Sequence, residues 1–342
     1  MSNQPPIEVP QGAIRLNTDS QRLEFFAQDR WYEMATEEAS GIGNRGFRVS
    51  GTGAGATLIE SFNITTLGNS HDTGFDLSTS RGAFGCSASR TRAIIAGGNA
   101  PGVSNSNDIQ YFEMTALSNT IDFGDLTATM AESGAHSNNV RFVIAGAASN
   151  ANNVINFLTV ASTGSAQDFG DQANKLSSTT ACGSPTRGLF AGGAIPSVVN
   201  IIEFVTIAST GNSVDFGDLT VARYSAGSGS NNTRGLFIMG NAGSPTNQVN
   251  TIDFVTISST GNAQDFGDSN MNDTGGPTQG AGVAASPNRI VFFGGYITGG
   301  TDRTTEMEYV NPTTRGNSTR FGDLETAQNS DGNALSSSHG GL

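Results

Sequence analysis

A stretch of eight residues recurs almost unchanged in the second half of the chain and constrains the fold more than any other feature. Thr186-Arg-Gly-Leu-Phe-Ala-Gly-Gly193 returns 47 residues later as Thr233-Arg-Gly-Leu-Phe-Ile-Met-Gly240. Each copy is followed by a β-rich run and then by Asp-Phe-Gly-Asp, at 215–218 and 265–268. Self-similarity at a period of this size is typical of solenoids, propellers and repeat arrays.

The same order of residues recurs along most of the chain. An arginine opens the first apolar strand of each unit at Arg45, Arg92, Arg141, Arg187, Arg234 and Arg289. Phe-Gly-Asp ends the later units, with its aspartate at Asp125, Asp171, Asp218, Asp268 and Asp323, and Gly74-Phe-Asp-Leu77 is a degraded first copy. Six units of roughly 47 to 55 residues result, and each holds about four short β-runs separated by turns. Such a unit has the size and pattern of one four-stranded propeller blade.

The composition favours strands and turns over helices. Glycine contributes 45 residues, charged residues make up only 14% of the chain, and Lys175 is its one lysine. Glycine, serine, threonine and asparagine are turn and strand residues rather than helix formers. We therefore predict an all-β protein, a six-bladed kelch-like β-propeller preceded by a small N-terminal β-meander.

The two ends of the repeat region indicate how the ring closes. The first unit begins abruptly near Asn44, without the strand that precedes the arginine in the other units. The C-terminal segment 324–338 aligns with Leu219–Ser230, which supplies that strand in a complete unit. We expect segment 324–338 to complete the first blade of a propeller spanning 44–342, because closure removes the exposed sheet edges of an open array.

Residues 1–37 do not belong to the repeat. Three short amphipathic runs, Ala13–Leu16, Arg22–Phe26 and Trp31–Ala35, are separated by turn residues and predict a three-stranded meander. A sheet of this size buries too little to be stable alone, so it is expected to dock on the propeller, on copies of itself or on another protein. Residues 38–43 are expected to form a linker.

The repeats resemble those of kelch proteins, which are β-propellers. Arg223-Tyr-Ser-Ala-Gly227 precedes an apolar strand, and such strands end in Gly-Gly at 97–98, 192–193 and 294–295. The chain departs from the kelch pattern in its last strand, where phenylalanine replaces the usual tryptophan. The resemblance implies a fold rather than an activity, since one propeller scaffold hosts many functions.

A second resemblance lies in the N-terminal segment. Gly12-Ala-Ile-Arg-Leu-Asn-Thr18, Leu23-Glu-Phe-Phe26 and Arg30-Trp-Tyr-Glu33 together resemble a short module of tailed-bacteriophage structural proteins, particularly marine and cyanobacterial ones. In those proteins the module attaches to the particle and the repeat domain projects outward. The resemblance implies a non-enzymatic virion protein, made in the host cytoplasm and attached to tail or capsid through other virion proteins. The implied attachment residues are Ile14, Leu16, Leu23, Phe25, Trp31 and Tyr32, with Trp31 also suited to homo-oligomerisation.

Two readings of the propeller remain open. Uneven loops at Asn99–Asn107, Ala194–Val199, Asn241–Asn250, Ser269–Gln279 and Tyr296–Arg303 are expected on one face. Variable loops on a rigid frame are a common binding device, and Tyr296 offers an aromatic platform for a host-surface sugar. Solvent-exposed loops without a ligand fit the pattern equally well. The alternative function is a cellular kelch-type scaffold that binds a protein through this face.

The charged repeats have two interpretations of their own. A ring of aspartates at 125, 171, 218, 268 and 323 would suggest Ca²⁺, but no loop places ligands at alternate positions as calcium sites do. The favoured interpretation is structural: each aspartate caps its own turn or pairs with the arginine of its repeat between blades. Repetition in nearly every blade argues against a catalytic role, which needs one asymmetric constellation.

Other chemistries leave little trace in the sequence. The net charge of −13 disfavours nucleic-acid binding, and no run is long and apolar enough to insert into a membrane or act as a signal peptide. His71, His136 and His339 lack metal-ligand spacing and are expected to lie apart. Cys86 and Cys182 lie two repeats apart and are expected to be free thiols. We expect no enzymatic activity, no cofactor and no metal.

Overall fold

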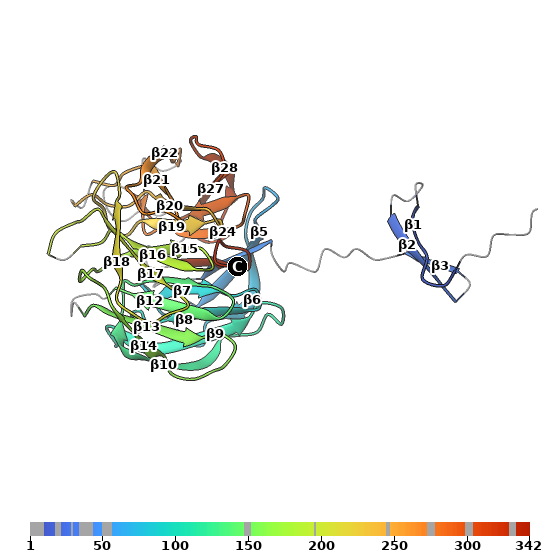
Figure 1. Cartoon of the computed structure of the whole chain (residues 1–342), viewed down its shortest axis with the longest axis horizontal. Coiled ribbons are helices and arrows are strands. Elements are labelled where there is room, and N and C mark those ends of the chain that lie inside the picture. The colour runs from blue at the N-terminus through green and yellow to red at the C-terminus, as the bar shows by residue number, and fades with distance from the viewer. Residues whose placement is uncertain are drawn as a thin grey trace, which may run out of the picture. The chain divides into compact units, whose positions relative to one another are not determined.

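The computed structural model describes residues 10–17, 22–28, 30–33, 44–49, 57–146, 152–194, 196–243, 247–271, 278–297, 304–327 and 333–342. The chain divides into two compact units, Met1–Gly41 and Ile42–Leu342. Every regular element in the described ranges is a β-strand (Figure 1). The expected linker at 38–43 lies outside the described residues.

The second unit is built from six four-stranded antiparallel sheets, each corresponding to one sequence repeat. The first contains β29 (Asn333–Ser336), β4 (Arg45–Val49), β5 (Leu58–Asn63) and β6 (His71–Asp76). The second contains β7 (Gly85–Ala88), β8 (Arg92–Ala96), β9 (Ser106–Glu113) and β10 (Ile121–Met130). The third contains β11 (Gly134–Ser137), β12 (Arg141–Ala145), β13 (Val154–Thr159) and β14 (Gln167–Asp171).

The remaining three sheets repeat the same order of strands. The fourth contains β15 (Thr180–Gly183), β16 (Arg187–Ala191), β17 (Ile201–Thr206) and β18 (Val214–Asp218). The fifth contains β19 (Gly227–Ser230), β20 (Arg234–Ile238), β21 (Thr251–Thr256) and β22 (Gln264–Asp268). The sixth contains β24 (Gly282–Ala285), β25 (Ile290–Phe293), β27 (Glu306–Val310) and β28 (Thr319–Asp323), and beside it β23 (Thr278–Gln279) pairs with β26 (Tyr296–Ile297).

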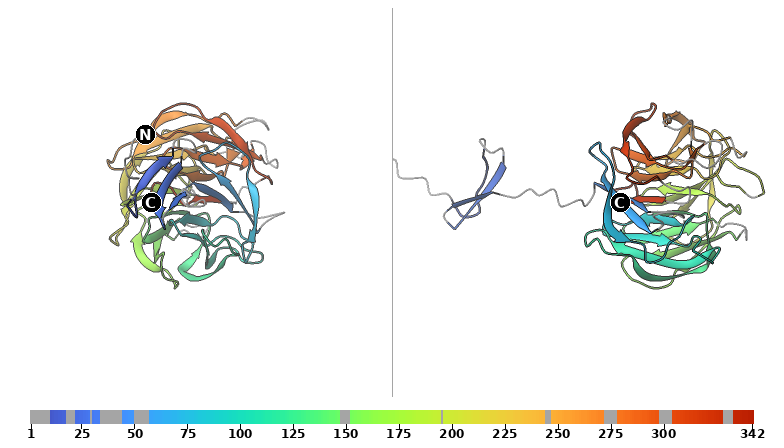
Figure 2. Two further views of the ribbon diagram at one scale, coloured as in Figure 1. Left: turned by 90° about the vertical axis from the view of Figure 1, so that its right-hand side faces the viewer. Right: turned by 180° about the vertical axis from the view of Figure 1, so that it is seen from behind.

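The innermost strands close a ring. Each inner strand contacts the next in the order β7, β11, β15, β19, β24 and β29, and β29 contacts β7 again. Figure 2 shows the sheets following one another in chain order, from blue through green and yellow to red. Strand β29 pairs with β4, so both ends of this unit contribute to the first blade. The predicted six-bladed β-propeller is confirmed.

Small residues fill the inner strands because six strands converge there. Strand β19 reads Gly-Ser-Gly-Ser, and a Cβ atom on Gly227 or Gly229 would lie within 3.0 Å of the Val283 side chain on β24. Outside this layer, the phenylalanine of each Phe-Gly-Asp is at most 4% exposed and packs with apolar residues of its own blade and of the next. The apolar core therefore lies between successive blades, and small side chains line the axis.

The recurring arginines tie each blade to the next. In five interfaces the guanidinium Nη1 donates a hydrogen bond to a main-chain carbonyl of the following blade at 2.8–3.0 Å: Arg92 to Val160, Arg141 to Ile207, Arg187 to Ile257, Arg234 to Pro312 and Arg289 to Ile64. The last of these bonds joins the sixth blade to the first. The same guanidinium groups lie 4.5–4.8 Å from the ring centroids of Tyr111, Phe157, Phe204, Phe254 and Tyr309. These arginines thus bind carbonyl oxygens and aromatic rings rather than the aspartates of Phe-Gly-Asp.

Phe-Gly-Asp instead joins neighbouring blades through its main chain. In the interface between the fourth and fifth blades, the Gly261 amide donates to the Phe216 carbonyl at 2.7 Å, and the Asp218 amide donates to Asn262 Oδ1 at 3.1 Å. A Cβ atom on Gly217 would lie 2.5 Å from the Gly261 backbone, so only glycine permits this approach. The motif recurs because the blade contact recurs.

In four of the six blades, a buried polar residue on the third strand adds a contact that the sequence analysis missed. Glu203, Asp253, Glu60 and Asn156 accept the main-chain amides of Asn174, Thr220, Thr326 and Thr127 from the preceding blade at 2.9–3.1 Å. Each acceptor is at most 1% exposed. The signal was present in the repeats as one polar residue inside an otherwise apolar run, for example Ile201-Ile-Glu-Phe-Val205.

The first unit is an antiparallel sheet of β1 (Ile14–Asn17), β2 (Arg22–Ala27) and β3 (Arg30–Glu33). The Arg15 guanidinium lies 2.7 Å from Glu24 Oε2 and 4.1 Å from the ring centroid of Trp31. The Trp31 ring packs edge-on against Phe26, with centroids 5.3 Å apart. Charged and aromatic residues thus hold the three strands together.

Candidate functional site: the central cavity

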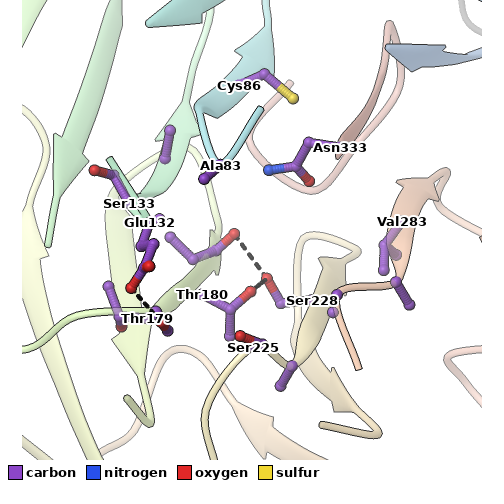
Figure 3. Close-up of a pocket in the computed structure, with 18 of the residues that line it drawn as sticks. Ala83, Cys86, Glu132, Ser133, Thr179, Thr180, Ser225, Ser228, Val283 and Asn333 are labelled. Atoms are coloured by element: carbon purple, nitrogen blue, oxygen red, sulfur yellow. Dashed lines mark hydrogen bonds between the residues drawn. The ribbon is translucent and has the colours of Figure 1, made fainter. Parts of the chain in front are cut away.

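A cavity of about 250 Å³ opens where the inner strands begin. All six blades contribute to its wall, and Figure 3 shows side chains from different strands around one space. Representative wall residues, one from each blade in ring order, are Asn333, Cys86, Glu132, Thr180, Ser228 and Val283. Concave sites of this kind on a rigid frame are where small ligands usually bind.

The rim of the cavity is a ring of residues with left-handed backbone. Ala83, Glu132, Ser178 and Ser225 have φ between 49° and 56°, and Gly280 occupies the same place in the sixth blade with φ of 73°. The Glu132 amide donates to the Ala83 carbonyl at 2.6 Å, and the Ser225 amide donates to the Ser178 carbonyl at 2.9 Å. A positive φ costs a non-glycine residue about 1 kcal/mol or more. These hydrogen bonds between blades offset that cost and hold the rim in one shape.

The polar side chains of the cavity are mostly hydroxyls. Ser178 Oγ donates to Glu132 Oε2 at 2.6 Å, and the hydroxyls of Thr180 and Ser228 are 2.5 Å apart. Of the wall residues that the structure describes, Glu132 is the one that carries a charge. Within the described part of the chain, Glu132 Oε1 and the Ser225 hydroxyl have no hydrogen-bond partner, so both are available to a ligand.

The far end of the channel is closed by the C-terminus. The ring of His339 donates through Nε2 to the Ala88 carbonyl at 2.6 Å, and the Gly340 amide donates to the Ser230 carbonyl at 2.9 Å. We call residues 339–342 the C-terminal plug. Because it crosses the ends of inner strands from two blades, the cavity is open at one end only.

The plug brings two histidines together, which corrects the expectation that the three histidines lie apart. The rings of His136 and His339 meet edge-on with centroids 5.6 Å apart, while His71 lies elsewhere and contacts Ser61. Burial, with a smaller effect of His339, lowers the pKa of His136 to about 3, and burial lowers the pKa of His339 to about 4. The plug lies beyond the last strand of the repeat, so the repeat pattern could not predict where its residues lie.

The two cysteines are free, as predicted, and both are buried. Burial raises the pKa of the Cys86 thiol far above its usual value and that of Cys182 to about 12. A neutral buried thiol is a poor nucleophile and a poor metal ligand. Both cysteines therefore act as small apolar residues near the axis.

The described ends of the uneven loops lie at the open end of the cavity, while 244–246, 272–277 and 298–303 lie outside the described residues. Isolated bridges join Gly82 to Asn99, Ser177 to Ala194 and Tyr224 to Asn241, so these loops meet the segments that lead into the inner strands. In the sixth blade, Tyr296 pairs with Gln279, which precedes the rim residue Gly280. The predicted ligand-loop residue Tyr296 is thus placed beside the cavity mouth, although its side chain lies outside the described part.

The predicted attachment residues all belong to the first unit. Ile14 and Leu16 on β1 are 64% and 60% exposed. Strand register pairs Ile14 with Phe25, Phe25 with Tyr32, and Leu16 with Leu23, while Trp31 pairs with Phe26. The side chains of Leu23 and Phe25 lie outside the described part. The register nevertheless makes five of the six predicted residues cross-strand neighbours.

No model of a known protein family matches the chain, and no curated protein matches its sequence. In the described ranges, no three His, Cys, Asp or Glu side chains gather closely enough to hold a metal ion. No helix of sufficient length and apolar character to cross a membrane occurs in the same ranges. The propeller, its cavity and the N-terminal sheet are therefore the features of the molecule that bear on its function.

Proposed function

We propose that this protein is a non-enzymatic structural component of a tailed-bacteriophage virion, a tail- or capsid-attached appendage. The N-terminal sheet binds other virion proteins, and the propeller projects and binds host-surface glycans. The observation that carries the proposal is the exposure of Ile14 and Leu16 on a sheet of only three strands. Three strands are the lower limit for an independently stable sheet, so a partner that covers the exposed apolar side chains would stabilise this one.

The strand register supports a single docking surface. Ile14 and Tyr32 are both cross-strand neighbours of Phe25, and Leu16 pairs with Leu23. Cross-strand partners share one face of an antiparallel sheet, so the predicted attachment residues other than Trp31 belong to one face. Covering Ile14 and Leu16 alone would contribute about 1.5–3 kcal/mol for each side chain that becomes fully buried.

The chemistry of the propeller supports a binding role rather than a catalytic one. Catalysis usually needs several titratable groups with matched pKa values in one place. Among the described residues of the cavity wall, Glu132 is the one carboxylate and Tyr224 the one phenol, and the Cys86 thiol is neutral. Both buried histidines donate to main-chain carbonyls at the closed end and have strongly lowered pKa values.

A second candidate is a cellular kelch-type scaffold that binds a protein through the loop face. The gathering of the loops around one end of the axis favours it, because such a face suits a peptide as well as a glycan. The two proposals differ in the role of the first unit. A scaffold acting through its loops needs no N-terminal docking surface.

Deletion of residues 1–37 tests the virion proposal. We expect the truncated protein to fold as a propeller and to be missing from purified particles. A milder variant, Ile14→Asp with Leu16→Asp, should also lose incorporation, while Leu67→Asp, at a side chain 59% exposed on the propeller, should not. Particles that still contain the truncated protein at wild-type copy number would contradict the attachment role.

A further inference from the structure

We propose that the central cavity is the glycan site of this protein and that it takes one terminal neutral sugar residue. This inference rests on the glycan-binding part of the proposed function and gives it a location and a ligand class. It moves the site from the Tyr296 loop to the axis of the propeller. Three properties of the cavity carry it: its size, its polar groups and its charge.

The size and shape of the cavity limit the ligand to one small group. A volume of about 250 Å³ is slightly below the range of roughly 300–1,000 Å³ found for pockets of drug-sized molecules. Because the C-terminal plug blocks the far end, a chain cannot thread through the axis. Only the end of a larger glycan can enter, and the rest must leave past the loops at the mouth.

The free polar groups of the rim match a sugar that presents adjacent hydroxyls. Ser178 links Glu132 to Ser225. Its hydroxyl donates a hydrogen bond to Glu132 Oε2, and its carbonyl accepts one from the Ser225 amide. This arrangement leaves Glu132 Oε1 as a charged acceptor and the Ser225 hydroxyl as a donor or acceptor. Hydrogen bonds from a hydroxyl to a carboxylate are about twice as strong as neutral ones. Tyr224 also lines the cavity with a half-buried side chain and offers apolar surface to a sugar ring, whereas Phe84 beside it is packed in the core.

The charge of the cavity excludes acidic sugars. Glu132 is the one charged side chain among the described residues of the wall, and the chain as a whole carries −13. No arginine or lysine in the described ranges lines the cavity to neutralise a ligand carboxylate. A sialic or uronic acid would place its carboxylate close to Glu132 in a partly desolvated site, which is unfavourable. Neutral hexoses and N-acetylhexosamines carry no such penalty.

The test uses the full-length protein and a set of methyl glycosides, with saturation-transfer NMR to detect binding and calorimetry to measure it. Neutral hexosides and N-acetylhexosaminides are compared with N-acetylneuraminic and glucuronic acids. Ala181→Leu places a larger side chain in the cavity from strand β15, and Glu132→Gln removes the charged acceptor while keeping a partner for Ser178. Asp265→Asn, an exposed site on β22, is the matched control for charge.

The expected result is binding of at least one neutral glycoside, with the acids at least tenfold weaker. Glu132→Gln should weaken binding about tenfold or more, Ala181→Leu should abolish it, and Asp265→Asn should leave it unchanged. If Ala181→Leu fails to fold, Glu132→Gln still decides the location.

Each contrary outcome has a distinct meaning. Neutral sugars bound equally by the wild type, Ala181→Leu and Glu132→Gln would place the site on the loops, overturning this inference and leaving glycan binding intact. A preference for the acidic sugars would overturn the ligand class. If no sugar binds, both the inference and the glycan-binding part of the function fail, while virion attachment remains decided by the deletion of residues 1–37.

Discussion

Acidic pH should lower the free energy of unfolding of the propeller through His136 and His339, the histidine pair at the closed end of the channel. The ring of His136 is 2% exposed, and its pKa is lowered to about 3 mainly by burial. A histidine in the unfolded chain has a pKa near 6.5, so between these values the unfolded chain binds more protons than the folded one. The contribution of the neutral His136 ring to the free energy of unfolding is therefore fully present above about pH 6.5 and is lost as the pH falls toward 3.

The size of the effect follows from the width of this window. One pKa unit corresponds to about 1.4 kcal/mol, so lowering the pH from 6.5 to 5 should cost about 2 kcal/mol through His136. His339, whose pKa is lowered to about 4, acts in the same direction with a smaller contribution because its side chain is partly exposed. Together they amount to an appreciable fraction of the roughly 5–15 kcal/mol that typically stabilises a domain.

The assay is the free energy of unfolding by chemical denaturation between pH 7.5 and 5. His136→Gln can still donate to the Ser184 carbonyl but cannot be protonated, so the part of the stability change that comes from the histidine pair should fall to less than half of its wild-type size. His71→Gln, at an exposed histidine, serves as the control and should keep the wild-type slope. An identical slope for His136→Gln and the wild type would refute the reasoning.

Three further predictions concern the ring itself. Arg289→Met removes the hydrogen bond to the Ile64 carbonyl and the contact with the Tyr309 ring. It should lower the free energy of unfolding by about 1–3 kcal/mol. Arg90→Met, at an exposed site, is the control and should leave the free energy of unfolding nearly unchanged. Gly217→Ala should destabilise more than Gly261→Ala in thermal melts, because both have positive φ but only the first places a Cβ against backbone; equal losses would mean that the blade contact does not matter. Deletion of residues 339–342 should open the second end of the channel, so that a small thiol reagent modifies Cys86 and Cys182 faster than in the wild type; unchanged rates would show that the plug does not seal it.

The sequence predicts the architecture because the repeat carries it. Six arginines in one phase and five copies of Phe-Gly-Asp mark the blades, and the missing strand before Arg45 indicates closure by the C-terminus. The motifs recur where the same contact between blades recurs. The partners within each contact were less predictable, because an arginine that binds a carbonyl oxygen leaves no complementary residue in the sequence.

The cavity was not predictable from the sequence for a related reason. Glu132, Ser178 and Ser225 occupy equivalent places in three repeats, but their side chains differ and the shared property is a positive φ, which the sequence does not display. The meeting of His136 with His339 depends on the C-terminal plug, which lies beyond the last strand. The site is therefore formed by side chains that differ between the repeats and by the C-terminal plug, not by the residues that the repeats share.

The most direct test of the account is cryo-electron microscopy of an intact particle that carries this protein. The account predicts the propeller on the outside of the particle with its cavity mouth accessible. It also predicts Ile14 and Leu16 buried against another virion protein. A particle in which these two side chains remain in solvent, or in which the propeller makes the attachment, would contradict it.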